Sequence, residues 1–396
     1  MNNQVNVKEL YNKIINNEKM VIIDLRSPEK FKTWKIDTMP NQEIHNLYYA
    51  EMLDTGDIEK DMENYIKTKF EKKFSQDAPI YTVCSEGETS KIFSKVLSSL
   101  GYKNVNNIKG GMKNWFNYYD YRTVIETPEL SIYQISRVSR GDLSWVIISD
   151  NQATIIDPLR HIDNYLKFIE SKNAKLAFIL DTHVHADHIS GGPEISEKLN
   201  IPYYFHPYDA IHPIDMIPGK VKFSFLKEGD ILTLGSAKIK VIHVPGHTLG
   251  NLVFLVNDKY LFTGDTIFID SIARPDLGGK GETWAPLQAE SLLRLSQLPN
   301  ETILLPAHFS KFSEANKDGL YIEKLEVIKE KNKDYNYLLT NGKEKFIKYM
   351  LDNLPVFPPQ YVDIKRVNVR LIEVDQQKAE ELETGKNVCA LAKAYA

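Results

Sequence analysis

Cysteine is nearly absent from the 396 residues, where Cys84 and Cys389 are the two examples. Two thiols are too few for a disulfide framework and suit a reducing compartment, so any role they have is expected to be reactive. Long apolar runs are also missing, and none approaches the roughly 18 residues that a membrane span needs. The first residues have no apolar stretch behind a basic start, so the sequence predicts a cytoplasmic protein without membrane contact.

An excess of positive charge is missing too. Lys and Arg total 49 against 53 Asp and Glu, the formal net charge is -4, and no long basic run occurs. Because a nucleic-acid backbone needs such a run for neutralisation, we expect no nucleic-acid partner. At roughly 150 residues per domain, the length predicts two to three domains.

The apolar pattern changes character along the chain. Short apolar runs at 21–25 and 79–84 alternate with the amphipathic stretch 90–101, which predicts a parallel α/β sheet. The stretch 118–130 lacks periodicity, and after it the chain becomes rich in paired strands with interleaved helices. We therefore expect α/β domains at residues 1–120 and 128–330, with a C-terminal extension, 331–396, packed on the second.

The densest group of chemical side chains follows the apolar strand LAFIL. It is the run THVHADHISGG, which places His183, His185, Asp187 and His188 within six residues. Imidazole and carboxylate are the ligands that zinc and Fe(II) favour. This loop is predicted to bind metal.

Three further strands end in a polar turn that carries one such residue. They deliver His247 in PGHT, Asp265 in TGDT and His308 in PAHFS. Active residues of α/β folds gather at strand ends, so we expect these side chains to join the loop.

The pattern H-x-H-x-D-H, followed by His247, Asp265 and His308, resembles the metallo-β-lactamase superfamily over about residues 131–315. The resemblance implies an αββα sandwich but chooses no reaction, because members include hydrolases and mononuclear iron oxygenases. It excludes the diiron flavoprotein branch, which carries Glu where His185 stands.

The segment ARPDL, with Arg274 and Asp276, resembles the persulfide dioxygenases of that superfamily. The resemblance implies one Fe(II) per chain, held by His183, His247 and Asp265, with Arg274 binding the anionic thiol substrate. It assigns supporting roles, or a second metal site, to the remaining residues His185, Asp187, His188 and His308. For Arg274, an ion pair with Asp276 stays open as the alternative.

Cys84 lies between the apolar strand PIYTV and the amphipathic stretch SKIFSKVL. Backbone N–H groups at such a turn stabilise a thiolate or a bound anion, which favours a nucleophile. The loop CSEGETS, with IDLRSPEKF before it and GGMKNWF after it, resembles a rhodanese domain over about residues 4–120.

The matching rhodanese framework residues are Asp24, Arg26, Gly110, Gly111 and Trp115. The resemblance implies that Cys84 carries sulfur as a persulfide. Glu86 and Glu88 depart from the Arg that many rhodaneses place in this loop, and their charges oppose an anionic substrate and a lowered Cys84 pKa. Transfer from thiosulfate is therefore in doubt, and a rhodanese module that only binds stays open.

The sequence thus predicts a rhodanese-like domain fused to a persulfide dioxygenase that oxidises a low-molecular-weight thiol persulfide with O2 to sulfite, in sulfide detoxification. Sulfite or thiosulfate would link the two sites, and glutathione, coenzyme A and bacillithiol all stay open as the carrier thiol. The resemblance also implies a homo-oligomer of two or four subunits. The alternatives are a binuclear zinc thioester hydrolase of the glyoxalase II type and a binding or sensing protein. Cys389 is expected to have no function.

Overall fold

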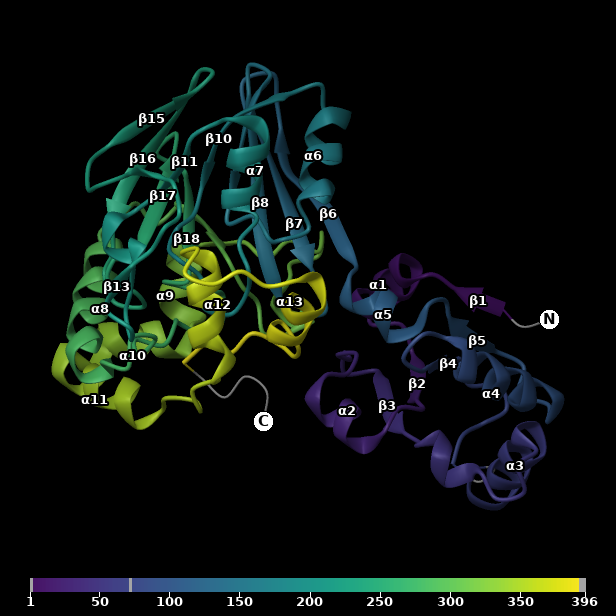
Figure 1. Ribbon diagram of the computed structural model, residues 1–396. Helices are drawn as coiled ribbons and strands as arrows, with labels where there is room; N and C mark the ends of the chain where they lie inside the picture. The colour runs from purple at the N-terminus through teal and green to yellow at the C-terminus, as the bar shows by residue number, and fades with distance from the viewer. Residues whose placement is uncertain (1–2, 71–72, 392–396) are drawn as a thin grey trace. The chain divides into compact units, whose positions relative to one another are not determined.

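The computed structural model describes residues 3–70 and 73–391, and the chain divides into two units. Unit 1 is Met1–Asp120 with Arg137–Arg140, and unit 2 is Tyr121–Ser136 with Gly141–Ala396. Each unit is built around its own sheets (Figure 1).

Unit 1 contains a five-stranded sheet in the order β1-β5-β4-β2-β3, and every neighbouring pair is parallel. The strands are β1 (Asn3–Val5), β2 (Met20–Asp24), β3 (Gln42–Asn46), β4 (Ile80–Val83) and β5 (Val105–Ile108). The helices are α1 (Val7–Ile15), α2 (Pro28–Thr33), η1 (Tyr49–Met52), α3 (Ile58–Tyr65), η2 (Ile66–Phe70), α4 (Glu88–Ser99) and α5 (Gly111–Phe116). β2 and β4 are buried along their whole length, as continuous apolar runs of a parallel sheet should be. The predicted parallel α/β domain is confirmed.

Unit 2 contains two larger sheets and a short hairpin. The seven-stranded sheet, in the order β14-β11-β10-β9-β8-β7-β6, consists of β6 (Tyr119–Glu126), β7 (Ser131–Arg137), β8 (Asp142–Ser149), β9 (Gln152–Ile156), β10 (Lys175–Leu180), β11 (Tyr203–Phe205) and β14 (Ser224–Phe225). The six-stranded sheet runs in sequence order through β15 (Ile231–Leu234), β16 (Ala237–His243), β17 (Leu252–Val256), β18 (Tyr260–Gly264), β19 (Ile303–Pro306) and β20 (Glu323–Lys324). The hairpin pairs β12 (Ile211–His212) with β13 (Ile217–Pro218).

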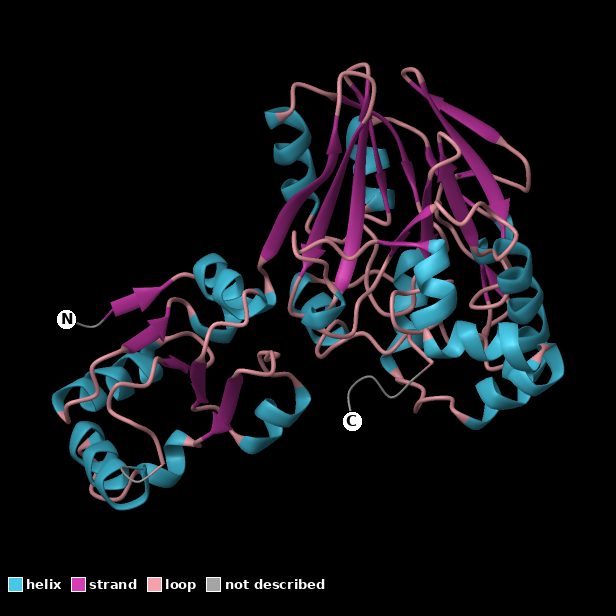
Figure 2. Ribbon diagram, turned by 180° about the vertical axis from the view of Figure 1, so that it is seen from behind, coloured by secondary structure: helices cyan, strands magenta, loops and turns pink. Residues whose placement is uncertain are grey.

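The two sheets of unit 2 pack face to face. Trp145 of β8 contacts the ring of Phe262 of β18 at a centroid distance of 5.9 Å, and its indole N–H donates to the Pro306 carbonyl at 2.9 Å. Helices cover the outer sides of the sheets (Figure 2). The helices of unit 2 are α6 (Ile162–Ser171), α7 (Gly192–Leu199), η3 (Pro207–Ala210), α8 (Gly281–Leu295), η4 (Phe312–Glu314), α9 (Leu325–Lys331), α10 (Lys333–Asn341), α11 (Lys343–Asp352), α12 (Gln360–Asn368) and α13 (Gln376–Leu382). The predicted αββα sandwich is confirmed.

The C-terminal region, whose pattern is hard to interpret from sequence alone, is largely helical. Phe346 and Met350 of α11 are buried in the same apolar cluster as Ala289 and Leu292 of α8, so α11 closes the outer side of the six-stranded sheet. Within the described residues, no helix has both the length and the apolar character needed to cross a membrane.

Candidate metal centre

The metal loop, residues 182–192, follows β10 and is held by a side chain far away in the chain. Asn368, at the end of α12, donates to the carbonyls of His185 and His188, each at 2.9 Å. Its side-chain oxygen accepts from the backbone N–H of Ser190 at 2.9 Å. All three bonds are buried, so the C-terminal region fixes the backbone of the metal loop.

Asp209, in η3, ties the metal loop to the loop after β16. Its carboxylate accepts from the backbone N–H of Val184 at 2.9 Å and from the Thr248 hydroxyl at 2.7 Å. It also accepts from the backbone N–H of Gly250 at 2.8 Å. One buried carboxylate therefore sets the relative position of two site loops.

His183, His247 and Asp265 come together as a fully buried group with their donor atoms within 4.8 Å of one another. The Asp265 Oδ2 atom lies 3.9 Å from His183 Nε2 and 3.4 Å from His247 Nε2. No described residue gives any of these atoms a hydrogen bond of acceptable geometry. Buried polar atoms are normally satisfied, so the group fits a metal ion, which would bind to these atoms.

Hydrogen bonds fix the orientation of both imidazoles. His247 Nδ1 lies 2.8 Å from the Arg274 carbonyl, which can only accept, so Nδ1 carries the proton. His183 Nδ1 lies 3.0 Å from the Thr182 hydroxyl, which itself donates to Asp157 at 3.0 Å. Both rings therefore use Nδ1 for these bonds and leave Nε2 facing the group, the orientation in which histidine binds a metal.

The surroundings also set the charges of this group. Burial lowers the pKa of His183 well below its usual value, and the neighbouring His185 adds to the effect. Burial alone would raise the pKa of Asp265, but the imidazoles of His308, His247 and His183 hold it well below its usual value. The neutral imidazole of His183 beside the ionised carboxylate of Asp265 can bind a cation.

His185 lies apart from this group. Its Nε2 atom is 3.2 Å from the carboxylate of Asp157. Burial lowers the pKa of His185, but the charge and hydrogen bond of Asp157, together with Asp181, raise it to about 9. Its other ring nitrogen, Nδ1, is buried and has no hydrogen-bond partner among the described residues, so this atom could still bind a cation.

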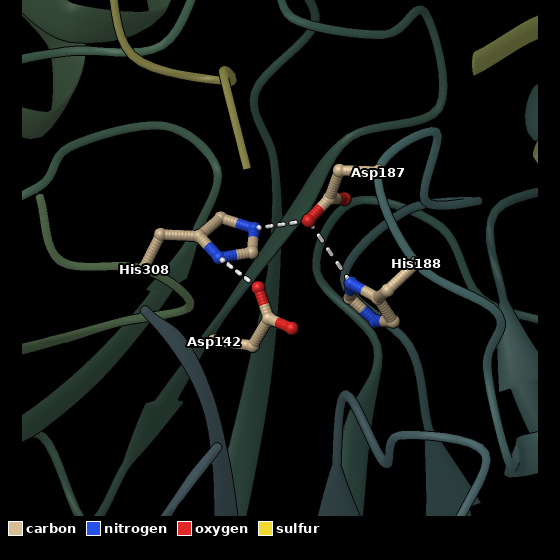
Figure 3. A group of neighbouring side chains, drawn as sticks. All are labelled: Asp142, Asp187, His188 and His308. Atoms are coloured by element: carbon tan, nitrogen blue, oxygen red, sulfur yellow. Dashed lines mark hydrogen bonds and ion pairs between the residues drawn. The ribbon is translucent and has the colours of Figure 1, made fainter. Parts of the chain in front are cut away.

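The remaining predicted residues form a second buried cluster, drawn in Figure 3. His308 Nε2 lies 3.3 Å from Asp187 Oδ2. The same nitrogen lies 3.1 Å from Asp265 Oδ1. Its Nδ1 atom lies 3.4 Å from Asp142 of β8, and His188 Nδ1 lies 3.2 Å from Asp187 Oδ2. Asp265 therefore stands between the two clusters and contacts both.

Arg274 is fully buried, and all five of its N–H donors meet acceptors within the protein. Two donate to Asp276 at 2.6 and 2.8 Å, and the other three to the carbonyls of Pro355 at 2.9 Å, Val356 at 3.3 Å and Val388 at 3.4 Å. In this arrangement the guanidinium offers no free donor to a substrate. The ion pair with Asp276, which the sequence left as the alternative, is the one observed.

A cavity of about 150 Å³ opens beside His247. Its lining includes Thr248, the next residue in the chain, and the ring of Trp284. It also includes Lys280, the carboxylate of Asp209 and the deeply buried Lys365 of α12, whose pKa is lowered by burial.

Cys84 lies in unit 1 at the turn from β4 to α4. Its sulfur accepts from the backbone N–H of Gly87 at 3.1 Å and of Ser90 at 3.4 Å, and from the Ser90 hydroxyl at 3.4 Å. Glu86 and Glu88 are both exposed, and Glu86 forms an ion pair with Lys113 at 3.7 Å. The sulfur thus faces N–H donors, while the two acidic residues turn to solvent.

The rhodanese framework residues support this loop. Gly111 has a φ of +57°, and a Cβ there would lie 2.3 Å from the Cys84 carbonyl oxygen, so glycine is required. Asp24 and Arg26 form a buried ion pair at 2.6 Å. Trp115 is fully buried, in α5. Gly110, with a φ of +74°, precedes α5.

Sequence reasoning missed the residues that position the site. Asp157, in IIDP, directly follows the buried strand β9, and the same strand-end rule that selected Asp265 could have selected it. Asp209, Asn368 and Glu383 follow no such pattern. Glu383 accepts from the metal-loop backbone at Ile189 at 2.9 Å, although 194 positions separate the two residues.

Comparison with known proteins gives two profile matches. The metallo-beta-lactamase superfamily matches residues 140–308, and the rhodanese-like domain matches residues 6–118. The chain is 32% identical over 180 residues to a hydroxyacylglutathione hydrolase of Pelagibacter ubique, covering 44% of this chain and 70% of the relative. It is 35% identical over 181 residues to an uncharacterized protein of Mycobacterium tuberculosis, covering 39% and 80%. The crystal structure of ETHE1 from Myxococcus xanthus is 23% identical, with a TM-score of 0.49, 64% of this chain covered and 99% of that chain.

Proposed function

Because the chain belongs to the metallo-β-lactamase superfamily and carries a rhodanese-like domain, we propose that it oxidises a thiol persulfide with O2. The reaction is RSSH + O2 + H2O → RSH + SO3²⁻ + 2H⁺. The proposed cofactor is one Fe(II) per chain, held by His183, His247 and Asp265.

The group of His183, His247 and Asp265 carries this proposal, because their donor atoms lie within 4.8 Å of one another. His185 stands outside this group, and its Nε2 atom lies 3.2 Å from Asp157. The group provides two imidazoles and one carboxylate. This is the donor set of the facial triad, which leaves positions open for O2 and a substrate and is typical of non-haem iron oxygenases.

When bound, Fe(II) supplies the redox chemistry that O2 requires and the protein side chains lack. The chain's own residues orient the ligand side chains and shield the site from water. The Arg274 carbonyl and the Thr182 hydroxyl bind the Nδ1 atoms of His247 and His183 and so turn each Nε2 atom toward the metal position. The complete burial of the group excludes bulk water, which protects a reactive sulfur species from side reactions.

The cavity beside His247 suits the carrier part of the substrate. Lys280 and Lys365 can pair with carboxylate or phosphate groups, which low-molecular-weight carrier thiols possess. Trp284 offers an apolar wall. These lysines take over the anion-binding role that the sequence assigned to Arg274.

Metal analysis of protein purified without oxygen, together with O2 uptake on adding a persulfide, tests the proposal. We expect one iron per chain and rapid uptake. His183→Ala should lose both, whereas His185→Gln should keep the iron because His185 stands outside the proposed ligand group. Oxygen uptake that survives His183→Ala, or iron that is lost equally in His185→Gln, would contradict the assignment.

The proposed role of Cys84 is sulfur transfer. A persulfide sulfur passes from RSS⁻ to the Cys84 thiolate, giving RS⁻ and Cys84–S–S⁻, and sulfite then takes it to give thiosulfate and the free thiolate. Both half-reactions are reversible, so the same site interconverts persulfide and thiosulfate. The N–H donors of Gly87 and Ser90 support an anionic sulfur at this position.

Sulfite-dependent thiosulfate formation measures this activity. Cys84→Ser should abolish it and leave O2 uptake unchanged, because Cys84 belongs to a different unit from the metal centre. Thiosulfate formation that continues in Cys84→Ser would contradict the proposal.

Thioester hydrolysis is the second candidate, since a relative of 32% identity is a hydroxyacylglutathione hydrolase. The cluster of Asp187, His188 and His308 could hold the second metal of such an enzyme. Hydrolysis of a hydroxyacylglutathione by protein holding two zinc ions, without O2 uptake, would favour this candidate.

A further inference from the structure

A buried network of polar side chains lies behind the Cys84 loop, residues 84–90. Its members come from two neighbouring strands and one helix, and each is at most 1% exposed. They are Thr82 of β4, Ser90 and Ser94 of α4, and Asn107 of β5. The core around them is apolar. Buried polar groups cost stability unless they are paired, so their position beside the reactive sulfur indicates a role in its chemistry.

Asn107 connects this network to the loop at two points. Its side-chain N–H donates to the Gly87 carbonyl at 3.0 Å, and its Oδ1 atom accepts from the Ser90 hydroxyl at 2.7 Å. The Gly87 carbonyl can only accept, so the orientation of the Asn107 amide is fixed. Thr82, which is paired with Asn107 in the sheet, places its hydroxyl 3.4 Å from the same Oδ1 atom. One side chain of β5 therefore holds both Gly87 and Ser90.

The Ser90 hydroxyl has one proton and several acceptors within reach. Its oxygen lies 2.7 Å from Asn107 Oδ1, 3.2 Å from the Gly87 carbonyl oxygen and 3.4 Å from the Cys84 sulfur. An anionic acceptor forms the stronger hydrogen bond, so the hydroxyl should turn to the sulfur when the sulfur carries charge and to Asn107 when it does not. The Thr82 hydroxyl can then donate to the Oδ1 atom that Ser90 leaves.

We propose that Asn107 is a positioning residue for sulfur transfer, which acts through Ser90 and supports Cys84 as a leaving group. The inference rests on the proposed transfer at Cys84. When sulfite attacks the terminal sulfur of Cys84–S–S⁻, a new S–S bond gives thiosulfate, the old one breaks, and its electron pair returns to the Cys84 sulfur as a thiolate. The loop CSEGETS contains no cationic side chain to stabilise that charge, so neutral donors must do so.

The two half-reactions place opposite demands on these donors. In the sulfite step the charge on the Cys84 sulfur grows, so the Ser90 hydroxyl binds it more strongly in the transition state and accelerates the step. In the charging step the Cys84 thiolate attacks RSS⁻ and loses charge. Donors that stabilise a thiolate also make it less nucleophilic, so their removal has opposing effects on charging. A loss of positioning should therefore slow the sulfite step selectively, whereas a disordered loop would slow both.

Single-turnover measurements on the full chain separate the two steps. The protein is charged with glutathione persulfide without oxygen, freed of excess reagent and mixed with sulfite, while mass spectrometry follows the bound sulfur and Cys84→Ser provides the blank. We expect Asn107→Ala to slow the sulfite step about tenfold or more and to change charging less than about threefold. Asn106→Ala is the matched control, because Asn106 is the preceding residue of β5 and its side chain points to the other face of the sheet. It should leave both rates within about twofold of wild type.

Ser90→Ala tests the connection between the two residues. It removes the hydroxyl itself, so it should show the same selective loss in the sulfite step. If Asn107 acts through Ser90, the double variant should be slowed by clearly less than the product of the two single effects.

Equal slowing of both steps in Asn107→Ala would reduce this residue to support of the fold and overturn the inference. An unchanged sulfite step in Ser90→Ala would also overturn it, and this result decides the matter even if Asn107→Ala does not fold. A wild type that takes up no sulfur would refute the proposed transfer, and the inference with it. A wild type that charges and discharges normally, with variants that do the same, would contradict the inference alone.

Discussion

Replacing Arg274 with lysine separates the two roles considered for this residue. The guanidinium fills five acceptors, whereas an ammonium group has three donors, so at least two acceptors lose their partner. A buried acceptor left unsatisfied costs about 1–3 kcal/mol, and some of this is recovered by relaxation. We therefore expect Arg274→Lys to destabilise unit 2 by about 2–4 kcal/mol.

Differential scanning calorimetry of the full chain measures this change. For a unit of this size, about 1 kcal/mol lowers the midpoint by about 2–4 °C, so the unit 2 transition should fall by roughly 4–16 °C. Arg366→Lys is the matched control. Arg366 pairs with Asp215 and Asp363, but its side chain is 32% exposed, so its loss should cost at most about 1 kcal/mol.

The kinetics complete the test. If Arg274 is held as the structure shows, Arg274→Lys should not selectively raise KM for a persulfide when measured well below the unfolding transition. Wild-type stability combined with a strongly raised KM would refute the reasoning, because it would mean that the guanidinium leaves Asp276 to meet the substrate.

Three further predictions concern other parts of the molecule. Gly111→Ala should reduce sulfur transfer at least tenfold, because the new Cβ would lie 2.3 Å from the Cys84 carbonyl oxygen. The control Gly56→Ala, also at positive φ but with no neighbour within 4 Å of the new Cβ, should keep the wild-type rate. Equal rates for the two variants in a sulfurtransferase assay would contradict this prediction. Burial and the stacked ring of His243 lower the pKa of His206 to about 4, so the unfolded chain binds more protons between about pH 4 and 6.5. Stability present above pH 6.5 should thus be lost as the pH falls through this window, by about 1–3 kcal/mol, and urea midpoints of His206→Asn should show a shallower pH dependence than wild type. Chelation of the metal should lower the unit 2 melting temperature, since buried carboxylates lose their cation, and adding metal back should restore it; an unchanged melting curve would argue against a site coupled to folding.

Local patterns in the sequence determine the architecture and indicate which residues carry chemistry. Continuous apolar runs form the central strands of both units, and the polar residues directly after those strands are brought together. The reason is geometric, because neighbouring strands that end at the same edge bring their following residues to one place. The position of the Cys84 loop is also determined locally, because the strand before it and the helix after it are its direct neighbours in the sequence.

Only the tertiary structure decides which of these residues contact one another. His185 contacts Asp157, which lies 28 positions earlier in the chain. Arg274 donates to the backbone carbonyls of residues 355, 356 and 388. Cys389 lies beside Asp187 and His308. Adjacent residues in H-x-H-x-D-H have the same ligand chemistry, so the motif cannot tell which imidazole stays neutral and which pairs with a carboxylate. That choice depends on burial and on charges delivered by distant segments, and these exist only once the chain has folded.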